Sequence, residues 1–139
     1  MKLRSASASR VGRRRFAQRM STRSCPTTRA TSCRSTSRPP LLQTGDAVRR
    51  GWEEWFPTFR GPIGYEIRDL SITVGDDVAF SHSLNRISGT RTSGEDADVW
   101  VRPTVCYRKT DGKWMVAHEH VSVPFYMDGS NRAAVDLRP

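Results

Sequence analysis

Charged residues are distributed so unevenly along the chain that a folded domain is expected only in its C-terminal part. Residues 1–40 contain Lys2 and ten arginines but no aspartate or glutamate, whereas residues 41–139 contain 12 basic and 14 acidic residues. The first segment consists mainly of Ser, Thr, Arg and Ala, with Phe16 as its one aromatic residue. Such a composition buries too little apolar surface to offset the entropy lost on ordering. We therefore expect a disordered basic arm over residues 1–40 and one globular domain over residues 41–139.

Four interpretations of this basic arm are open from the sequence. Clustered arginines release counterions from a nucleic acid or another polyanion, although nothing in residues 1–40 indicates recognition of a groove or a base. An Arg-rich, Ser-rich and acid-poor segment is also typical of an organelle transit peptide. The arm could otherwise be a solvated tail without a role, or the product of reading a GC-rich gene in the wrong frame. Binding of nucleic acid is expected only through this arm.

The composition of the whole chain excludes several classes of protein. No stretch approaches the roughly 20 apolar residues that span a bilayer, and the N-terminus lacks the apolar region of a secretory signal. Three cysteines, an odd number, argue against a disulfide scaffold and for a reducing compartment. The spacing of Cys25 and Cys33 fits no zinc motif. We expect a cytoplasmic protein with no membrane contact, no metal and no cofactor.

The sequence of residues 44–57 predicts one helix. Thr44 offers a hydroxyl for the N-cap and Asp46 places an acid in the first turn, while Pro57 ends the helix. Between them runs one apolar stripe with helical spacing, formed by Val48, Trp52, Trp55 and Phe56. We expect the three aromatic residues of this stripe to pack on a sheet, where they could also line a ligand pocket.

Beyond Pro57 the apolar residues recur with a period of two. Turn signals rich in Gly, Asp and Thr separate four such runs, at residues 65–74, 78–90, 98–109 and 113–125. Long strand-like runs joined by short turns predict consecutive antiparallel hairpins. The sequence therefore predicts an α+β protein in which one helix packs on an antiparallel meander sheet.

The last hairpin permits a register prediction. A three-residue loop over residues 110–112, with Gly112 supplying a positive φ, pairs Lys109 with Lys113. This register gathers an almost wholly apolar set on one side of the hairpin: Val99, Val101, Val105, Tyr107, Met115, Ala117, Val121 and Val123. Glu119 is the one acid on that side.

Three stretches carry a family resemblance: residues 51–56 (GWEEWF), 79–85 (AFSHSLN) and 111–124 (DGKWMVAHEHVSVP). After a single helix and a long meander, they resemble the second part of a nuclear-transport-factor-2-like (SnoaL-like) domain. That cone-shaped fold is shared by ketosteroid isomerase, scytalone dehydratase and limonene epoxide hydrolase. The ending is also similar to the association domain of calcium/calmodulin-dependent kinase II. The resemblance covers about residues 41–126 and implies a curved, cone-shaped sheet, although the fold hosts many functions.

The resemblance is weakest before the helix. Family members begin with one or two helices that cap the cone, and in ketosteroid isomerase this early part supplies the aspartate base. Here no carboxylate precedes Asp46, and residues 1–40 show no apolar periodicity. The resemblance therefore implies a cone without its cap, in which exposed apolar surface leaves the domain either marginally stable or dependent on oligomerisation. It also favours the out-of-frame interpretation of the arm.

Glu119 is the candidate catalytic acid or base. A lone carboxylate on an apolar face is poorly solvated, as proton-transfer chemistry requires, whereas the alternative is a glutamate that reaches water or pairs with an arginine. Tyr107 is expected on the same face, where it could orient a carbonyl or hydroxyl group. His82 is the third candidate in this catalytic set.

The opposite side of the hairpin carries a polar cluster of Arg102, His118 and His120. Both imidazoles of the H-x-H pattern point the same way on a strand, and with His82 they could hold zinc. The family resemblance implies no metal, so a subunit interface is the favoured reading of the two histidines. Arg102 is either part of that interface or a clamp for a carboxylate-bearing ligand.

These patterns favour a domain that binds a small, mostly apolar molecule in its cone and transfers a proton on it, as an isomerase or dehydratase does. A non-catalytic dimerisation or hub module is the first alternative, and a polyanion-binding protein acting through the arm is the second. Whether the protein is an enzyme is left open. We expect a homo-oligomer.

Overall fold

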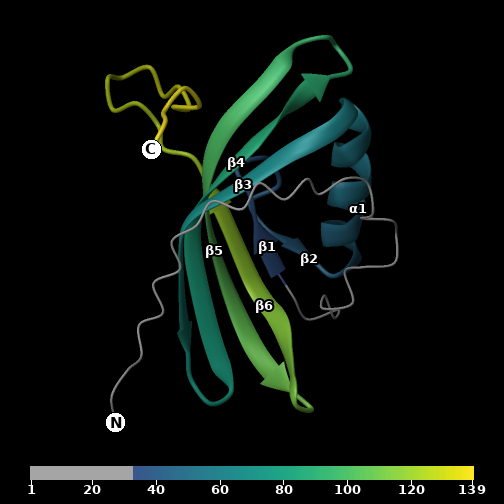
Figure 1. Cartoon of the computed structure of the whole chain (residues 1–139), viewed down its shortest axis with the longest axis vertical. Helices are drawn as coiled ribbons and strands as arrows, with labels where there is room; N and C mark the ends of the chain where they lie inside the picture. The colour runs from purple at the N-terminus through teal and green to yellow at the C-terminus, as the bar shows by residue number, and fades with distance from the viewer. Residues whose placement is uncertain (1–32) are drawn as a thin grey trace.

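The structure is a computed structural model and describes residues 33–139, which form one α-helix, a short 3-10 turn and six strands (Figure 1). The elements follow in the order β1 (Cys33–Ser35), β2 (Gln43–Thr44), α1 (Asp46–Trp55), η1 (Phe56–Thr58), β3 (Phe59–Val74), β4 (Val78–Arg91), β5 (Asp96–Thr110) and β6 (Lys113–Ser122). All six strands belong to one curved sheet with the order β2-β1-β6-β5-β4-β3.

Strands β3 to β6 form the predicted antiparallel meander. Their bounds lie close to the predicted ones, except that β3 begins at Phe59 and β6 ends at Ser122. The α+β prediction, one helix on a curved sheet, is confirmed. The sheet is mixed, however, because β1 runs parallel to β6 and β2 runs antiparallel to β1. Strands of two and three residues are too short to produce a periodic pattern, which is why the sequence did not predict them.

The segment expected to be a disordered arm contributes a strand. Residues 1–32 lie outside the described residues, but Cys33–Ser35 form β1 and bond to the edge of β6. The expected disorder therefore does not extend to these three residues. The domain boundary at residue 40 stays a prediction.

Helix α1 begins at Asp46 without the hydroxyl cap expected from Thr44, which belongs to β2. Gly45 occupies the N-cap position with a φ of 54°, a backbone conformation that glycine adopts without strain. The aromatic residues of the helix stripe pack against one another: the rings of Trp52 and Phe56 stack with centroids 5.6 Å apart. Trp55 extends this cluster to Phe59 of β3, at 4.9 Å.

The predicted register of the last hairpin is wrong. Asp111 and Gly112 form a two-residue turn with φ values of 51° and 74°, so that Thr110 pairs with Lys113. A turn with two positive φ values matches the twist of the strands, and aspartate tolerates that conformation. A bulge beside Cys106 then shifts the pairing by one more residue. Beyond the bulge Val105 pairs with Glu119, so Glu119 lies on the predicted side after all.

The two faces of the sheet differ in burial. The inner face, which lies towards α1 in Figure 1, carries the buried residues Ser81, Asn85 and Val101. The outer face carries the residues that alternate with them. Along the edge strand β3, inner-face residues such as Ile67 and Ile72 are more than half exposed, so the described residues leave this edge of the inner face uncovered.

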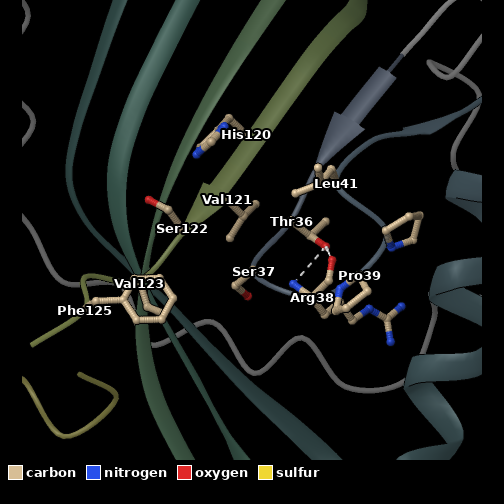
Figure 2. Close-up of a pocket in the computed structure, with 11 residues that line it drawn as sticks. Thr36, Ser37, Arg38, Pro39, Leu41, His120, Val121, Ser122, Val123 and Phe125 are labelled. Carbon is tan, nitrogen blue, oxygen red and sulfur yellow. Dashed lines mark hydrogen bonds between the residues drawn. The ribbon is translucent and has the colours of Figure 1, made fainter. Parts of the chain in front are cut away.

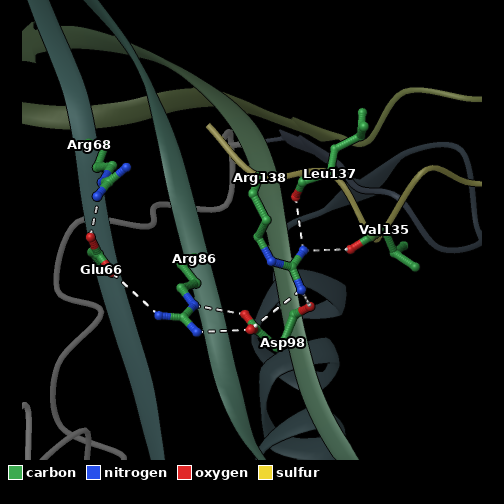
Figure 3. Close-up of polar contacts among 7 residues, drawn as sticks. All are labelled: Glu66, Arg68, Arg86, Asp98, Val135, Leu137 and Arg138. Atoms are coloured by element: carbon green, nitrogen blue, oxygen red, sulfur yellow. Dashed lines mark hydrogen bonds and ion pairs between the residues drawn. The ribbon is translucent and has the colours of Figure 1, made fainter.

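An ion-pair network on the outer face fixes the C-terminal tail to the sheet (Figure 3). Asp98 accepts two hydrogen bonds from the Arg86 guanidinium, at 2.7 and 2.8 Å, and lies 3.4 Å from the Arg138 guanidinium. Glu66 joins the same network through Arg68 at 3.1 Å and Arg86 at 3.8 Å. The hydrogen bonds from Arg86 lower the pKa of Asp98 below its ordinary value of 3.8.

The lowered pKa of Asp98 predicts a pH-dependent contribution to stability. A carboxyl group whose pKa falls on folding stabilises the folded state fully when the pH is above the ordinary pKa of the group. This contribution is lost as the pH falls through the lower pKa of the folded state. We expect Asp98→Asn to reduce the free energy of unfolding at neutral pH and to have little effect in strong acid. Urea unfolding at both pH values checks this, with Asp76→Asn in an exposed turn as the control. An equal loss at both pH values would contradict the prediction.

Burial of Val101 on the inner face predicts a larger effect on stability. Val101→Ala removes two methyl groups from a buried position and should lower the free energy of unfolding by about 1–3 kcal/mol. Val78→Ala is the matched control, because Val78 is exposed near the β3–β4 turn. Urea unfolding of the two variants should separate them clearly, and equal losses would mean that the inner face is not the core.

Candidate functional site

An ion pair joins β1 and β6 on the inner face. Arg34 and Glu119 are direct partners in the parallel ladder, and Nε of Arg34 lies 2.8 Å from Oε2 of Glu119. The side chains are only 11% and 25% exposed, so solvent screens this pair less than a surface pair. Glu119 is thus held by an arginine rather than standing alone on an apolar face, which is the alternative that the sequence left open.

The same arginine connects the ion pair to the helix. The Arg34 guanidinium carbon lies 4.0 Å from the ring centroid of Trp52. This cation–π contact stabilises the positive charge of Arg34 where its side chain is largely buried. Sequence reasoning missed Arg34, since nothing in its spacing distinguishes it from the other arginines of residues 1–40. An acid predicted on an apolar face was itself the signal that a basic partner was needed.

A second polar group on the inner face is a chain of hydrogen bonds that ends at Tyr65. The Ser83 hydroxyl donates to Oδ1 of Asn85 at 2.8 Å, and Nδ2 of Asn85 donates to the Tyr65 hydroxyl oxygen. Asn85 is buried, and its side chain accepts one of these hydrogen bonds and donates the other. Because Tyr65 accepts from Asn85, its own hydroxyl hydrogen is available to a ligand. The sequence analysis proposed neither Tyr65 nor Asn85.

The surroundings of Tyr65 keep its hydroxyl protonated. Burial of the phenol raises the pKa of Tyr65 above 10.0, the hydrogen bond from Asn85 lowers it, and the charge of Glu119 raises it again. The charge of Arg34 acts against that of Glu119. Although half of the whole residue is exposed, the hydroxyl reaches the buried Asn85. At neutral pH Tyr65 is therefore a hydrogen-bond donor within the electrostatic reach of the ion pair.

The structure separates His82 from the other two predicted catalytic residues, Glu119 and Tyr107. Tyr107 lies on the inner face with Glu119, and its hydroxyl is 3.3 Å from the Ser81 hydroxyl. Ser81 shares a cross-strand row with Val105 and Glu119. His82 instead pairs with Thr104, which pairs with His120, and that row belongs to the outer face. A layer of sheet thus lies between His82 and Glu119.

The predicted polar cluster does lie on the outer face. His120, beside Thr104, is exposed, and so is Arg102, which pairs with Ser122. His118 is half-buried, and its Nδ1 lies 2.9 Å from the Cys33 sulfur. Within residues 33–139, no group of three or more His, Cys, Asp or Glu side chains is arranged to hold a metal ion.

A cavity of about 580 Å³ opens at the end of β6, between the loop that follows β1 and the chain after β6 (Figure 2). Most of its lining surface is apolar. It is lined by Thr36, Ser37, Arg38, Pro39, Pro40, Leu41, His120, Val121, Ser122, Val123 and Phe125. The sequence did not predict this cavity because it depends on the position of β1 and its loop.

The coupling between Glu119 and Tyr65 can be measured. Since the charge of Glu119 raises the pKa of Tyr65, Glu119→Gln should lower it. Tyrosinate absorbance, recorded against the same protein with Tyr65→Phe, gives the pKa directly. Glu66→Gln is the matched control, because Glu66 is the next residue but lies on the outer face and should leave the pKa of Tyr65 nearly unchanged. If the pKa of Tyr65 is the same in Glu119→Gln as in the unchanged protein, the two side chains are too far apart to act on one substrate.

Comparison with known proteins agrees with this architecture. A model of the SnoaL-like domain family matches residues 12–126, a match that begins within the segment set apart by its charge. The crystal structure of an NTF2-like protein of unknown function from Pseudomonas putida KT2440 is 31% identical, with a TM-score of 0.72 over 81% of this chain and 78% of that chain. No curated protein matches the chain.

Two further solved structures share the fold at lower identity. A ketosteroid isomerase-like protein from Erwinia carotovora atroseptica is 21% identical over 69% of this chain and 75% of that chain, with a TM-score of 0.57. The association domain of CaMKII from C. elegans is 15% identical over 68% of this chain and 74% of that chain, with a TM-score of 0.52. In the described part of the chain, no helix has the length and apolar character needed to cross a membrane.

Proposed function

The chain belongs to the SnoaL-like domain family, and from that premise we propose that its inner face binds a small, mostly apolar carbonyl compound and transfers a proton on it. One observation carries the proposal: the Arg34–Glu119 ion pair and the Asn85–Tyr65 hydrogen bond lie on the same face of the sheet. Trp52 contacts the ion pair and supplies an apolar surface beside it. A carboxylate, a phenol donor and an aromatic wall are the groups that such a reaction needs.

In this proposal Glu119 and Tyr65 have complementary roles. The Glu119 carboxylate removes a proton from the carbon between the carbonyl and a carbon–carbon double bond, and returns it to the far carbon of that double bond, which moves into conjugation with the carbonyl. Tyr65 donates its free hydroxyl hydrogen to the carbonyl oxygen, where negative charge develops as the proton leaves. Arg34 holds the carboxylate in place by a charge-assisted contact. Tyr107 offers a second hydroxyl on this face, while His82, on the outer face, has no part in the reaction.

One structural relative has a description that agrees with the proposed reaction. The Erwinia protein is described as ketosteroid isomerase-like, which is a statement about that protein and not about this chain. The support within this chain is that Tyr65 keeps its proton, since its pKa is raised, and that Glu119 is close enough to contribute to that shift.

The proposal extends to a cytoplasmic homo-oligomer. Ile67, Ile72 and Val74 expose apolar surface along β3, which a second copy could cover. An association domain is among the structural relatives. Polyanion binding through the basic arm remains a separate prediction, since residues 1–32 lie outside the described residues.

Proton transfer can be tested with a simple unsaturated ketone. Cyclohex-3-enone in D₂O should isomerise to its conjugated form and take up deuterium in the presence of the protein, which NMR follows directly. We expect Glu119→Gln to reduce the rate by about 10²–10⁴-fold, as for loss of a general base. Tyr65→Phe should reduce it by about 10²-fold, as for loss of one oxyanion donor.

The matched control is Glu53→Gln, which neutralises an exposed glutamate on α1 and should leave the rate unchanged. Circular dichroism establishes that each variant is folded. A wild-type protein that exchanges no proton of this ketone, or a Glu119→Gln variant that keeps the wild-type rate, would overturn the proposed function.

A further inference from the structure

The outer face carries a thiol and an imidazole that the proposed function does not use. Sγ of Cys33 lies 2.9 Å from Nδ1 of His118, and it makes a longer contact of 3.9 Å with the Ala117 carbonyl oxygen. Both side chains are half-buried, which leaves them within reach of a small molecule. The two residues are direct partners in the parallel ladder between β1 and β6, so their side chains leave the sheet on the same face.

This arrangement is the geometry of a nucleophile with its base. A cysteine attacks as the thiolate, and an imidazole nitrogen within hydrogen-bond distance can accept the thiol proton. When the ring proton of His118 is on Nε2, Nδ1 is the acceptor that faces Cys33.

The cavity at the end of β6 lies next to this pair. His120, which pairs with Ser35, lines the cavity and stands two residues beyond His118 on β6, a spacing of about 7 Å along a strand. The opposite wall of the cavity comes from the loop that directly follows β1 (Figure 2). Its lining is mostly apolar and contains no acidic residue. A volume of about 580 Å³ suits a small organic molecule.

We propose that Cys33 and His118 form a covalent site for apolar α,β-unsaturated carbonyl compounds, whose hydrocarbon part occupies the adjacent cavity. The Cys33 sulfur bonds to the β-carbon while its proton passes to Nδ1 of His118. The π electrons of the carbon–carbon double bond move to form the enolate, and His118 then delivers the proton to the α-carbon. The product is a thioether, and the addition has no leaving group and needs no oxidant or reductant.

Cys106 provides an internal comparison. It pairs with His118 from the other side, on β5, and is half-buried like Cys33, but no hydrogen bond joins its sulfur to His118 in the described part of the chain. With β6 between them, the two cysteines are about 10 Å apart across the sheet, beyond the span of a disulfide. They therefore do not form a redox couple with each other, and Cys106 reports the reactivity of a similar thiol without the contact.

The covalent site stands apart from the proposed function, because Glu119 lies on the opposite face of the sheet. Loss of one activity therefore does not imply loss of the other.

The pair is tested by rates of adduct formation in the full chain with Cys25→Ser. Trans-2-nonenal is the apolar probe and acrylamide the small polar one, with peptide mass spectrometry distinguishing Cys33 from Cys106. We expect Cys33 to react with nonenal at least tenfold faster than Cys106, and His118→Gln to remove that difference. An unfolded variant would show itself by faster reaction of Cys106. Equal rates at the two cysteines, or a Cys33 rate unaffected by His118→Gln, would overturn the proposal.

The role of the cavity is tested by Leu41→Asp. Leu41 lines the cavity but is 95% exposed, so the substitution should not disturb folding. We expect the Cys33 rate with nonenal to fall several-fold and the rate with acrylamide to stay the same. Met127→Asp is the matched control, because Met127 is 97% exposed and lies outside the cavity lining. An unchanged ratio of the two rates in Leu41→Asp would mean that the cavity does not hold the probe.

Discussion

The pairing of β1 with β6 is the contact on which both candidate sites depend. Three residues of β1 add to the edge of β6 in parallel, and the alternation of side chains then sends neighbours to opposite faces. Arg34 meets Glu119 on the inner face, whereas Cys33 meets His118 on the outer face. The loop after β1 also forms one wall of the cavity. Without this short strand, Glu119 would lack its basic partner and His118 its thiol.

The Arg34–Glu119 ion pair on the inner face loses solvation on burial, and several favourable contacts offset this loss. Burying an ion pair costs solvation, and that cost is recovered only when geometry and further contacts are good. Here the Arg34 side chain contacts both Glu119 and the Trp52 ring, which links β1, β6 and α1 through a single side chain. Tyr65 and Asn85 approach the same region from β3 and β4. Glu119 and Arg34 lie close enough to Tyr65 for their charges to change its pKa, so these groups, distant in sequence, act on one another.

The sequence predicted the elements with strong periodicity and missed the contacts that depend on short strands. The apolar stripe of α1 and the alternation along β3 to β6 were sufficient to predict one helix on an antiparallel meander, whereas the curvature of the sheet was implied by the family resemblance. Glu119 was placed on the correct face. That placement succeeded although the register was wrong, since the true pairing beyond the bulge differs from the predicted one by two residues, which preserves the face. Arg34 sits in a strand of three residues with no pattern of its own. Tyr65 and Asn85 become a pair only through cross-strand geometry.

A double-mutant cycle between Arg34 and Glu119 tests the central claim that β1 brings these two side chains together. The free energies of unfolding of Arg34→Met, Glu119→Gln and the double variant are compared with that of the unchanged protein. A direct, largely buried pair predicts a coupling energy of about 0.5–3 kcal/mol. Effects that add within about 0.5 kcal/mol would contradict the contact, and with it the arrangement of both sites.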